Sequence, residues 1–142
     1  MYKTILVALE NSATDEVILR HIRGLAKVLS SRLVLMHVAD GHAARNQEQL
    51  NLEDSAEIRE DREYLAKRKR ELEGDGFEVR TLLALGDPAT QLVNAAQQEG
   101  CELIAMATHG HKGIEDIVLG SVATGVRHRT EIPVLMVKAP KK

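Results

Sequence analysis

The chain has 142 residues, a length that typically corresponds to one domain with a single hydrophobic core. Apolar residues make up 44% of it and charged residues 28%, the balance of a globular protein rather than of a disordered or membrane-spanning one. The formal net charge of −2 argues against nucleic-acid binding, which needs clustered Lys and Arg to neutralise phosphates. We therefore expect one domain over residues 1–142 and no nucleic acid as a partner.

The composition also bears on localisation and redox chemistry. The N-terminal apolar run, Ile5 to Leu9, is shorter than the apolar core of a signal peptide, which needs about 7 to 15 residues. No stretch approaches the roughly 20 apolar residues of a membrane span. The lone cysteine, Cys101, cannot form an internal disulfide, and its place before an apolar run favours a structural thiol. The sequence predicts a cytoplasmic protein that is not an integral membrane protein.

The beginning of the chain has the pattern of a strand, a helix and a second strand. Ile5 to Leu9 is continuously apolar, which is typical of a strand covered on both faces in a parallel sheet. Ser12 can cap a helix whose apolar residues recur at three- and four-residue steps from Val17 to Leu29. A second buried strand is expected at Leu33 to Val38, and we interpret His37 within it as a core histidine with satisfied hydrogen bonds.

The alternation continues after a polar loop. The turn Gly86-Asp87-Pro88 predicts a helix capped by Asp87, with Pro88 at its first position. The basic run from Lys67 to Arg70 lies in a segment of mixed charge, which indicates a solvated helix face. The remaining elements are expected as a helix at about Leu52 to Gly74, a strand at Phe77 to Leu85, a helix from Pro88 to Gly100, a strand at Leu103 to Ala107, a helix near Ser121 to Thr130 and a strand at Val134 to Val137.

Five apolar strands that alternate with four helices predict an α/β fold. The strands would form a five-stranded parallel sheet with helices on both faces, because each strand-helix-strand crossover is right-handed. In such a sheet, ligands bind beyond the carboxyl ends of the strands, where the winding direction reverses. The loops after the first and fourth strands are therefore the candidate site.

The segment from Ala107 to Ser121 carries the clearest chemical signal. Its glycines, Gly110, Gly113 and Gly120, would let backbone amides approach an anion closely. We expect Gly120 and Ser121 to open a helix, whose free amides and dipole favour phosphate, and the Ser121 hydroxyl can add a donor. The alternative is that these glycines only shape turns and permit close packing, and spacing alone does not decide between the two.

Other known site patterns fit this segment less well. The chain has no P-loop and no G-x-G-x-x-G after its first strand, and Ser121 does not lie in a G-x-S-x-G nucleophile elbow. His109 and His111 could add positive charge beside Lys112 or could hold a metal, but two histidines on a loop are weak evidence for a metal site. We expect no catalytic residues and no metal site of the protein's own.

Several segments together resemble the universal stress proteins. The resemblance rests, in chain order, on Ile-Leu-Val-Ala-Leu-Glu-Asn-Ser at 5–12, Leu-Val-Leu-Met-His-Val at 33–38, Gly-Asp-Pro at 86–88, the segment from Ala-Thr-His-Gly at 107–110 to Leu-Gly-Ser-Val-Ala at 119–123, and Ile-Pro-Val-Leu-Met-Val-Lys at 132–138. It covers essentially the whole chain. It implies a Rossmann-like fold, similar to that of the adenine nucleotide alpha hydrolases, and ATP as a regulatory ligand, with at most a slow ATPase activity. We expect magnesium to be carried on the phosphates of ATP, because it prefers oxygen ligands and commonly binds substrate phosphates.

The resemblance also assigns residues. Nucleotide-binding members have the pattern G-x2-G-x9-G-[ST], which Gly110, Gly120 and Ser121 match, while Ala107 stands at its first glycine. Where the family usually has Asp-Gly-Ser after the first strand, this chain has Glu10-Asn11-Ser12. The implied contacts are Gly110, Gly120, Ser121 and Val122 on the phosphates, His109 near them, Ala8, Val38 and Met106 around adenine and ribose, and Glu10 on the nucleoside.

Assembly and function follow the same resemblance. Pro133 to Val137 would form an edge strand of bare aliphatic residues, and such an edge favours pairing. The family implies a homodimer through this strand and a stress-response role toward a regulated partner such as a transporter or kinase. Two alternatives remain: a dimeric protein-interaction module of the same fold that binds no nucleotide, and a small adenylating or phosphoryl-transfer enzyme, for which the chain lacks room and catalytic residues.

Overall fold

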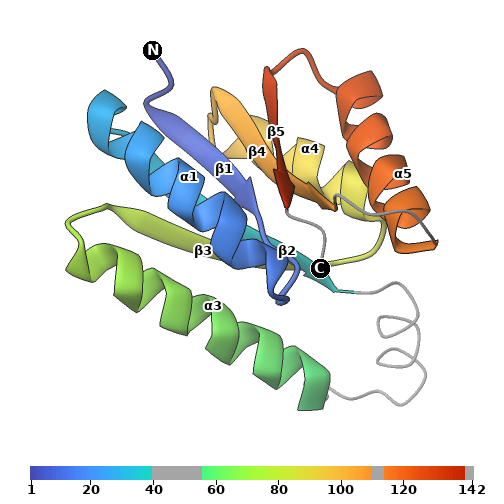
Figure 1. The fold of residues 1–142 in the computed structure, drawn as a ribbon, viewed down its shortest axis with the longest axis horizontal. Coiled ribbons are helices and arrows are strands. Elements are labelled where there is room, and N and C mark those ends of the chain that lie inside the picture. Colours follow the sequence, from blue (N-terminus) through green and yellow to red (C-terminus); the bar gives the residue numbers. More distant parts are fainter. Residues whose placement is uncertain (40–55, 110–113, 140–142) are drawn as a thin grey trace.

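Five parallel strands form a central sheet that lies between two layers of helices (Figure 1). The computed structural model describes residues 1–39, 56–109 and 114–139, and within 109–121 it describes the bounds of elements but not side chains. The strand order is β3-β2-β1-β4-β5. The strands are β1 (Thr4–Ala8), β2 (Arg32–Ala39), β3 (Val79–Leu85), β4 (Leu103–His109) and β5 (Val134–Ala139). The described helices are α1 (Thr14–Leu29), α3 (Ala56–Gly74), α4 (Pro88–Gln98) and α5 (Ile114–Arg129).

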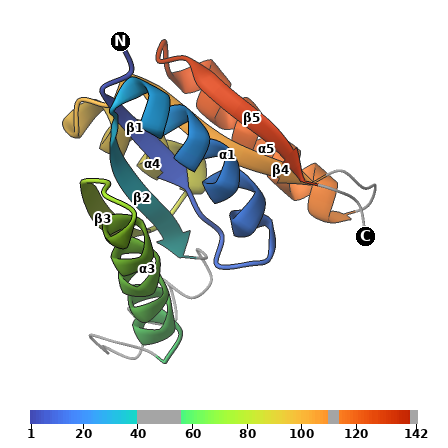
Figure 2. The ribbon, with the colours of Figure 1, turned by 60° about the vertical axis from the view of Figure 1, so that its left-hand side comes forward.

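The continuous apolar runs form buried strands because helices cover both faces of the sheet. Along β1, Ile5 and Val7 pack into a cluster with residues of α1 and α3, while Leu6 between them packs into a second cluster with residues of α4 and α5. Figures 1 and 2 show the same arrangement, with α1 and α3 on one side of the sheet and α4 and α5 on the other. The α/β fold predicted from the sequence, a five-stranded parallel sheet with helices on both faces, is confirmed.

The helix starts show one confirmed cap and two errors. The Asp87 side chain accepts a hydrogen bond from the Thr90 backbone N–H at 3.0 Å, and Pro88 follows it, as predicted. The expected Ser12 cap is wrong: the residue before α1 is Ala13, and the Ser12 hydroxyl bonds the Thr14 hydroxyl instead.

The second error concerns the last helix. Gly120 and Ser121 were expected to open it, but α5 begins at Ile114, so both residues lie inside the helix. The residues from Ile114 to Leu119 include no proline or glycine, and their apolar positions allow them to form the first turns themselves. The free amides of the α5 N-terminus therefore belong to the residues that follow Gly113, not to Gly120 and Ser121.

The remaining bounds differ by a few residues from the predicted ones. β3 begins at Val79 rather than Phe77, and β4 and β5 extend to His109 and Ala139. The predicted start of the long charged helix at Leu52 lies outside the described residues, and the described helix begins at Ala56. Within the described part of the chain, none of the helices combines the length and the apolar character that a membrane crossing requires.

Candidate functional site

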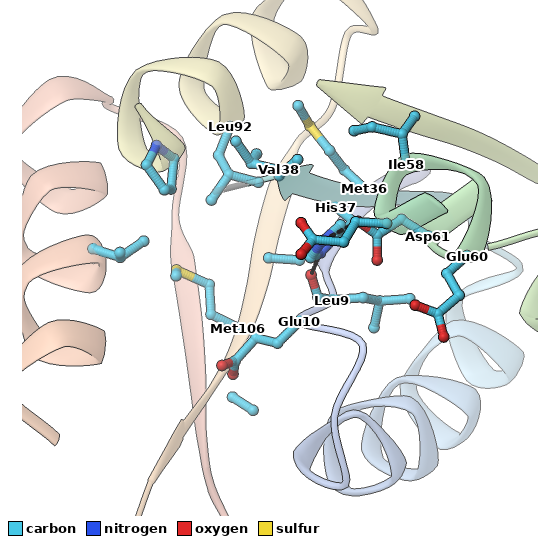
Figure 3. A pocket seen from close by; sticks show the side chains of 16 residues that line it. Leu9, Glu10, Met36, His37, Val38, Ile58, Glu60, Asp61, Leu92 and Met106 are labelled. Atoms are coloured by element: carbon cyan, nitrogen blue, oxygen red, sulfur yellow. Dashed lines mark hydrogen bonds and ion pairs between the residues drawn. The ribbon is translucent and has the colours of Figure 1, made fainter. Parts of the chain in front are cut away.

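A pocket of about 610 Å³ lies at the carboxyl ends of β1, β2 and β4 (Figure 3). β1 pairs with β2 on one side and with β4 on the other, so the chain winds in opposite directions from this strand. This reversal is where open parallel sheets bind their ligands. The lining residues are Ala8, Leu9, Glu10, Met36, His37, Val38, Ala39, Glu57, Ile58, Glu60, Asp61, Pro88, Leu92, Met106, Ala107 and Val122.

Six of the ten predicted site residues line this pocket. They are Ala8, Glu10, Val38, Met106, Ala107 and Val122, and they come from the ends of three strands, the loop after β1 and helix α5. Of the other four, His109 ends β4, and Gly120 and Ser121 lie in α5, but their side chains are outside the described residues. Gly110 is itself outside the described residues.

The sequence analysis missed the contributions of two helices. Glu57, Ile58, Glu60 and Asp61 of α3 line the pocket, as does Leu92 of α4. Pro88 could have been found, because the Gly86-Asp87-Pro88 turn follows β3 and therefore lies at the same edge of the sheet. The role of α3 had no such signal, since its docking over the carboxyl edge depends on tertiary contacts.

The inner part of the pocket is apolar. Met36, Met106 and Ala107 are almost fully buried there, with exposed fractions of 2%, 5% and 6%. Most ligand pockets combine such apolar walls with a few polar groups that fix orientation. No Phe, Tyr or Trp is among the lining residues in the described part of the chain, so a planar ligand would be held mainly between aliphatic and thioether side chains, with the His37 ring as the aromatic group present.

The loop after β1 is organised around the carboxylate of Asp15, which is 1% exposed. This carboxylate accepts hydrogen bonds from the backbone N–H groups of Glu10, Asn11 and Ser12 at 2.9, 2.8 and 3.4 Å. Successive backbone N–H groups in such a loop form a concave anion site. Here a carboxylate of the chain already occupies that site. An anionic group of a ligand would therefore have to bind elsewhere in the pocket.

Helix α3 is tied to this loop through the same carboxylate. The Tyr64 hydroxyl donates to Asp15 Oδ2 at 2.5 Å and accepts from Arg68 Nε at 3.1 Å. The Arg68 guanidinium also donates, through Nη2, to Glu16 Oε1 of α1 at 2.5 Å. Burial and the hydrogen bond to Asp15 raise the pKa of Tyr64, and the hydrogen bond from Arg68 lowers the pKa of Glu16. The hydroxyl thus stays protonated and able to donate.

A second link joins α3 to the strand ends. Asp61 accepts from the Asn11 side-chain amide at Oδ1, 3.0 Å away, and its Oδ2 lies 3.3 Å from His37 Nε2. His37 Nδ1 lies 2.9 Å from the Leu9 carbonyl oxygen. His37 was interpreted as a satisfied core histidine. Nδ1 has a hydrogen-bond partner and Nε2 lies at ion-pair distance from Asp61, but the ring lines the pocket rather than the core (Figure 3).

The charged lining residues are unevenly placed. The carboxylates of Glu10, Glu57, Glu60 and Asp61 come from the loop after β1 and from α3, whereas the described residues of β4 and α5 in the wall, Met106, Ala107 and Val122, are apolar. Like charges repel, so a polyphosphate is disfavoured beside α3. The half of the pocket formed by β4 and α5 is electrostatically the better place for phosphates.

The fold and the pocket together define an α/β protein with a pocket at the switch point of a parallel sheet, where such folds bind ligands. The family model described as the universal stress protein family matches residues 1–138. The chain belongs to the universal stress protein family.

Individual relatives cover nearly all of the chain. Universal stress protein MJ0577 of Methanocaldococcus jannaschii is 30% identical, over 97% of this chain and 96% of the relative. A solved structure of MJ0577 superposes with a TM-score of 0.77, at 31% identity, over 100% of this chain and 99% of the other. The structure of a universal stress protein from Archaeoglobus fulgidus in complex with dAMP has a TM-score of 0.70, at 22% identity, over 96% of this chain and 98% of the other.

Proposed function

We propose that this protein binds ATP in the pocket at the carboxyl ends of β1, β2 and β4, as a regulatory ligand in a stress response. One observation carries the proposal: six positions assigned to a nucleotide by family resemblance meet in one pocket at the switch point. Family membership supports a stress-response role, and a relative of the same fold has been solved in complex with dAMP. The nucleotide acts by changing the affinity for a partner, such as a transporter or kinase, in the cytoplasm.

The charge distribution orients the nucleotide. Adenosine lies among Val38, Met106 and Ala8, with Glu10 at the nucleoside, and the phosphates extend toward the segment that includes Gly110, Gly120 and Ser121, with His109 near them. Magnesium accompanies the phosphates, because it commonly binds nucleotide oxygens and keeps several waters. Among the described residues, no group of three or more His, Cys, Asp or Glu side chains is placed to hold a metal ion. Calorimetry with magnesium alone is therefore expected to show no tight binding.

Native mass spectrometry of the untreated protein, followed by heating to release ligand, tests for a bound nucleotide. A direct test of the site is Val122→Trp, which places a large ring in the pocket and is expected to weaken ATP binding by at least about tenfold, measured by calorimetry. Val28→Trp is the matched control, because Val28 is 83% exposed on α1 and does not line the pocket. Equal ATP affinity in both variants would contradict the assignment.

The protein is further proposed to form a homodimer through β5. This strand is at one edge of the sheet, and Met136 in it is 42% exposed. An unpaired edge with an exposed apolar side chain favours pairing with a second copy. If the wild type binds no nucleotide but is dimeric, the protein is instead an interaction module of the same fold.

A further inference from the structure

Helices α4 and α5 pack against each other on one face of the sheet, and Gly125 of α5 lies directly against α4 (Figure 1). A methyl group at Gly125 would lie 2.9 Å from the Ala89 Cβ atom of α4. Carbon atoms attract each other best at about 3.5–4.0 Å, so such a methyl group would push the two helices apart. Gly125 therefore lets α5 approach α4 more closely than a residue with a side chain could.

Of the two atoms that such a methyl group would crowd, only the Ala89 Cβ atom resists displacement. The other is Arg129 Nη1, at 2.8 Å, which ends a flexible side chain that is 51% exposed and can turn into solvent. The Ala89 Cβ atom is fixed to the backbone of α4, and Ala89 is only 4% exposed within a core cluster that includes residues of both helices. The contact between Gly125 and Ala89 thus limits how closely the helices approach.

Both sides of this contact lie one helical turn from the pocket. Val122, three residues before Gly125, lines the pocket from α5. Leu92, three residues after Ala89, lines it from α4. Residues three positions apart lie on the same face of a helix, so a shift of either helix at the contact also moves the lining residue one turn away.

We propose that Gly125 is a positioning residue that sets the width of the pocket between α4 and α5 and thereby the affinity for the nucleotide. The inference rests on the proposed function, since it takes a nucleotide as the ligand. Relieving a contact of 2.9 Å requires a displacement of about 0.5–1 Å, and a gap of that size forfeits about a quarter to a half of the dispersion attraction across it. The inner part of the pocket is apolar, so a ligand there depends on such close contacts.

Calorimetric titration of Gly125→Ala with ATP tests this inference. We expect ATP to bind about tenfold more weakly than to the wild type, because the pocket walls no longer fit the ligand closely. The rescue variant combines Gly125→Ala with Ala89→Gly, which moves the methyl group from one helix to the other and restores the close approach. Its affinity for ATP is expected to return to that of the wild type.

Gly24→Ala is the matched control, because Gly24 also lies in a helix, α1, where a methyl group would meet no atom within 4 Å. It should bind ATP as the wild type does. Ala89→Val crowds the same contact from α4, so it should also weaken ATP binding, and it replaces Gly125→Ala if that variant does not fold. A crowded variant with wild-type affinity, or a double variant that binds no better than Gly125→Ala, would overturn the inference.

Failure of the nucleotide proposal is recognised separately. If the wild type binds neither ATP nor adenosine, the proposed function fails, and crystal structures of the ligand-free proteins then test the positioning. The distance between the Cα atoms of Leu92 and Val122 is expected to grow by about 0.5–1 Å in Gly125→Ala and to return to the wild-type value in the double variant. An unchanged distance in Gly125→Ala would show that Gly125 does not set the width of the pocket.

Discussion

The hydroxyl of Tyr64 is a single atom whose removal should measurably destabilise the protein. It donates to Asp15 Oδ2 at 2.5 Å, and Asp15 is 1% exposed. Tyr64→Phe removes this donor but keeps the ring, which packs against the core cluster beneath α1 and α3. The change therefore removes the hydrogen bond to a buried carboxylate and the one accepted from Arg68, with little change in apolar packing.

The loss of stability depends on the hydrogen bonds that Asp15 keeps in the Tyr64→Phe variant. Backbone N–H groups of Glu10 and Asn11 still donate to it, so the carboxylate does not become an unpaired buried charge. A hydrogen bond to a charged group contributes about 1.5 to 3 kcal/mol, and we expect the free energy of unfolding to fall by about that amount. Arg68 also loses the hydroxyl oxygen as an acceptor but retains Glu16 and Glu71.

Urea denaturation followed by circular dichroism measures this loss. Tyr2→Phe is the control, because Tyr2 is also partly buried against the core, and none of the side-chain hydrogen bonds described involves its hydroxyl. We expect Tyr2→Phe to change the free energy of unfolding by less than about 0.5 kcal/mol. If Tyr64→Phe costs no more than Tyr2→Phe, then Tyr64 does not hold α3 to the loop after β1, and the account of this contact is wrong.

Three further outcomes are expected. Gly120→Val should reduce ATP binding more than Ser121→Ala, because it adds a branched side chain at a position that the family pattern assigns to the phosphates. Ser121→Ala removes only one hydroxyl contact to phosphate, worth roughly 10- to 150-fold in affinity, and equal ATP-induced shifts in melting temperature for wild type and Gly120→Val would rule out a phosphate role for Gly120. Met136→Lys should convert a dimer to a monomer in light scattering, because it places a charge on the exposed edge of β5. Cys101, whose pKa burial raises to about 11, should resist alkylation at neutral pH until the protein is unfolded, and rapid alkylation of the folded protein would contradict this.

Most of the fold could be predicted from local sequence patterns. The apolar run of β1 predicted a strand buried on both faces, and Ile5, Leu6 and Val7 do alternate between the two core clusters. The Asp87 cap and the following Pro88 fixed the start of α4 to the residue. These features succeed because each one depends on residues close together in sequence. The α1 cap failed because this loop is ordered by Asp15 inside the helix, whose carboxylate accepts from the N–H groups of Glu10, Asn11 and Ser12, while the Ser12 hydroxyl bonds the Thr14 hydroxyl.

The site was predictable only where it follows strand ends. Ala8, Val38, Met106 and Ala107 lie at or near the carboxyl ends of their strands, and the parallel arrangement alone brings such positions together. The wall formed by α3 was not predictable in this way. Its amphipathic pattern indicates which residues are buried, such as Ile58, but not which edge of the sheet they cover. That choice is made by contacts between distant residues, such as those of Asp61 and Tyr64.

The departure from the family pattern at Asn11 has a structural explanation in these contacts. Asn11 has a φ of 61°, in the left-handed region that glycine adopts most easily and that asparagine tolerates better than most residues. The backbone of the usual Asp-Gly-Ser loop can therefore be kept with asparagine in place of glycine. The substitution adds what glycine lacks, a side-chain amide that donates to Asp61 of α3. In this chain the loop after β1 is thus hydrogen-bonded directly to the helix that forms the acidic wall of the pocket. The position of that wall therefore depends on the same loop that places Glu10 in the pocket lining.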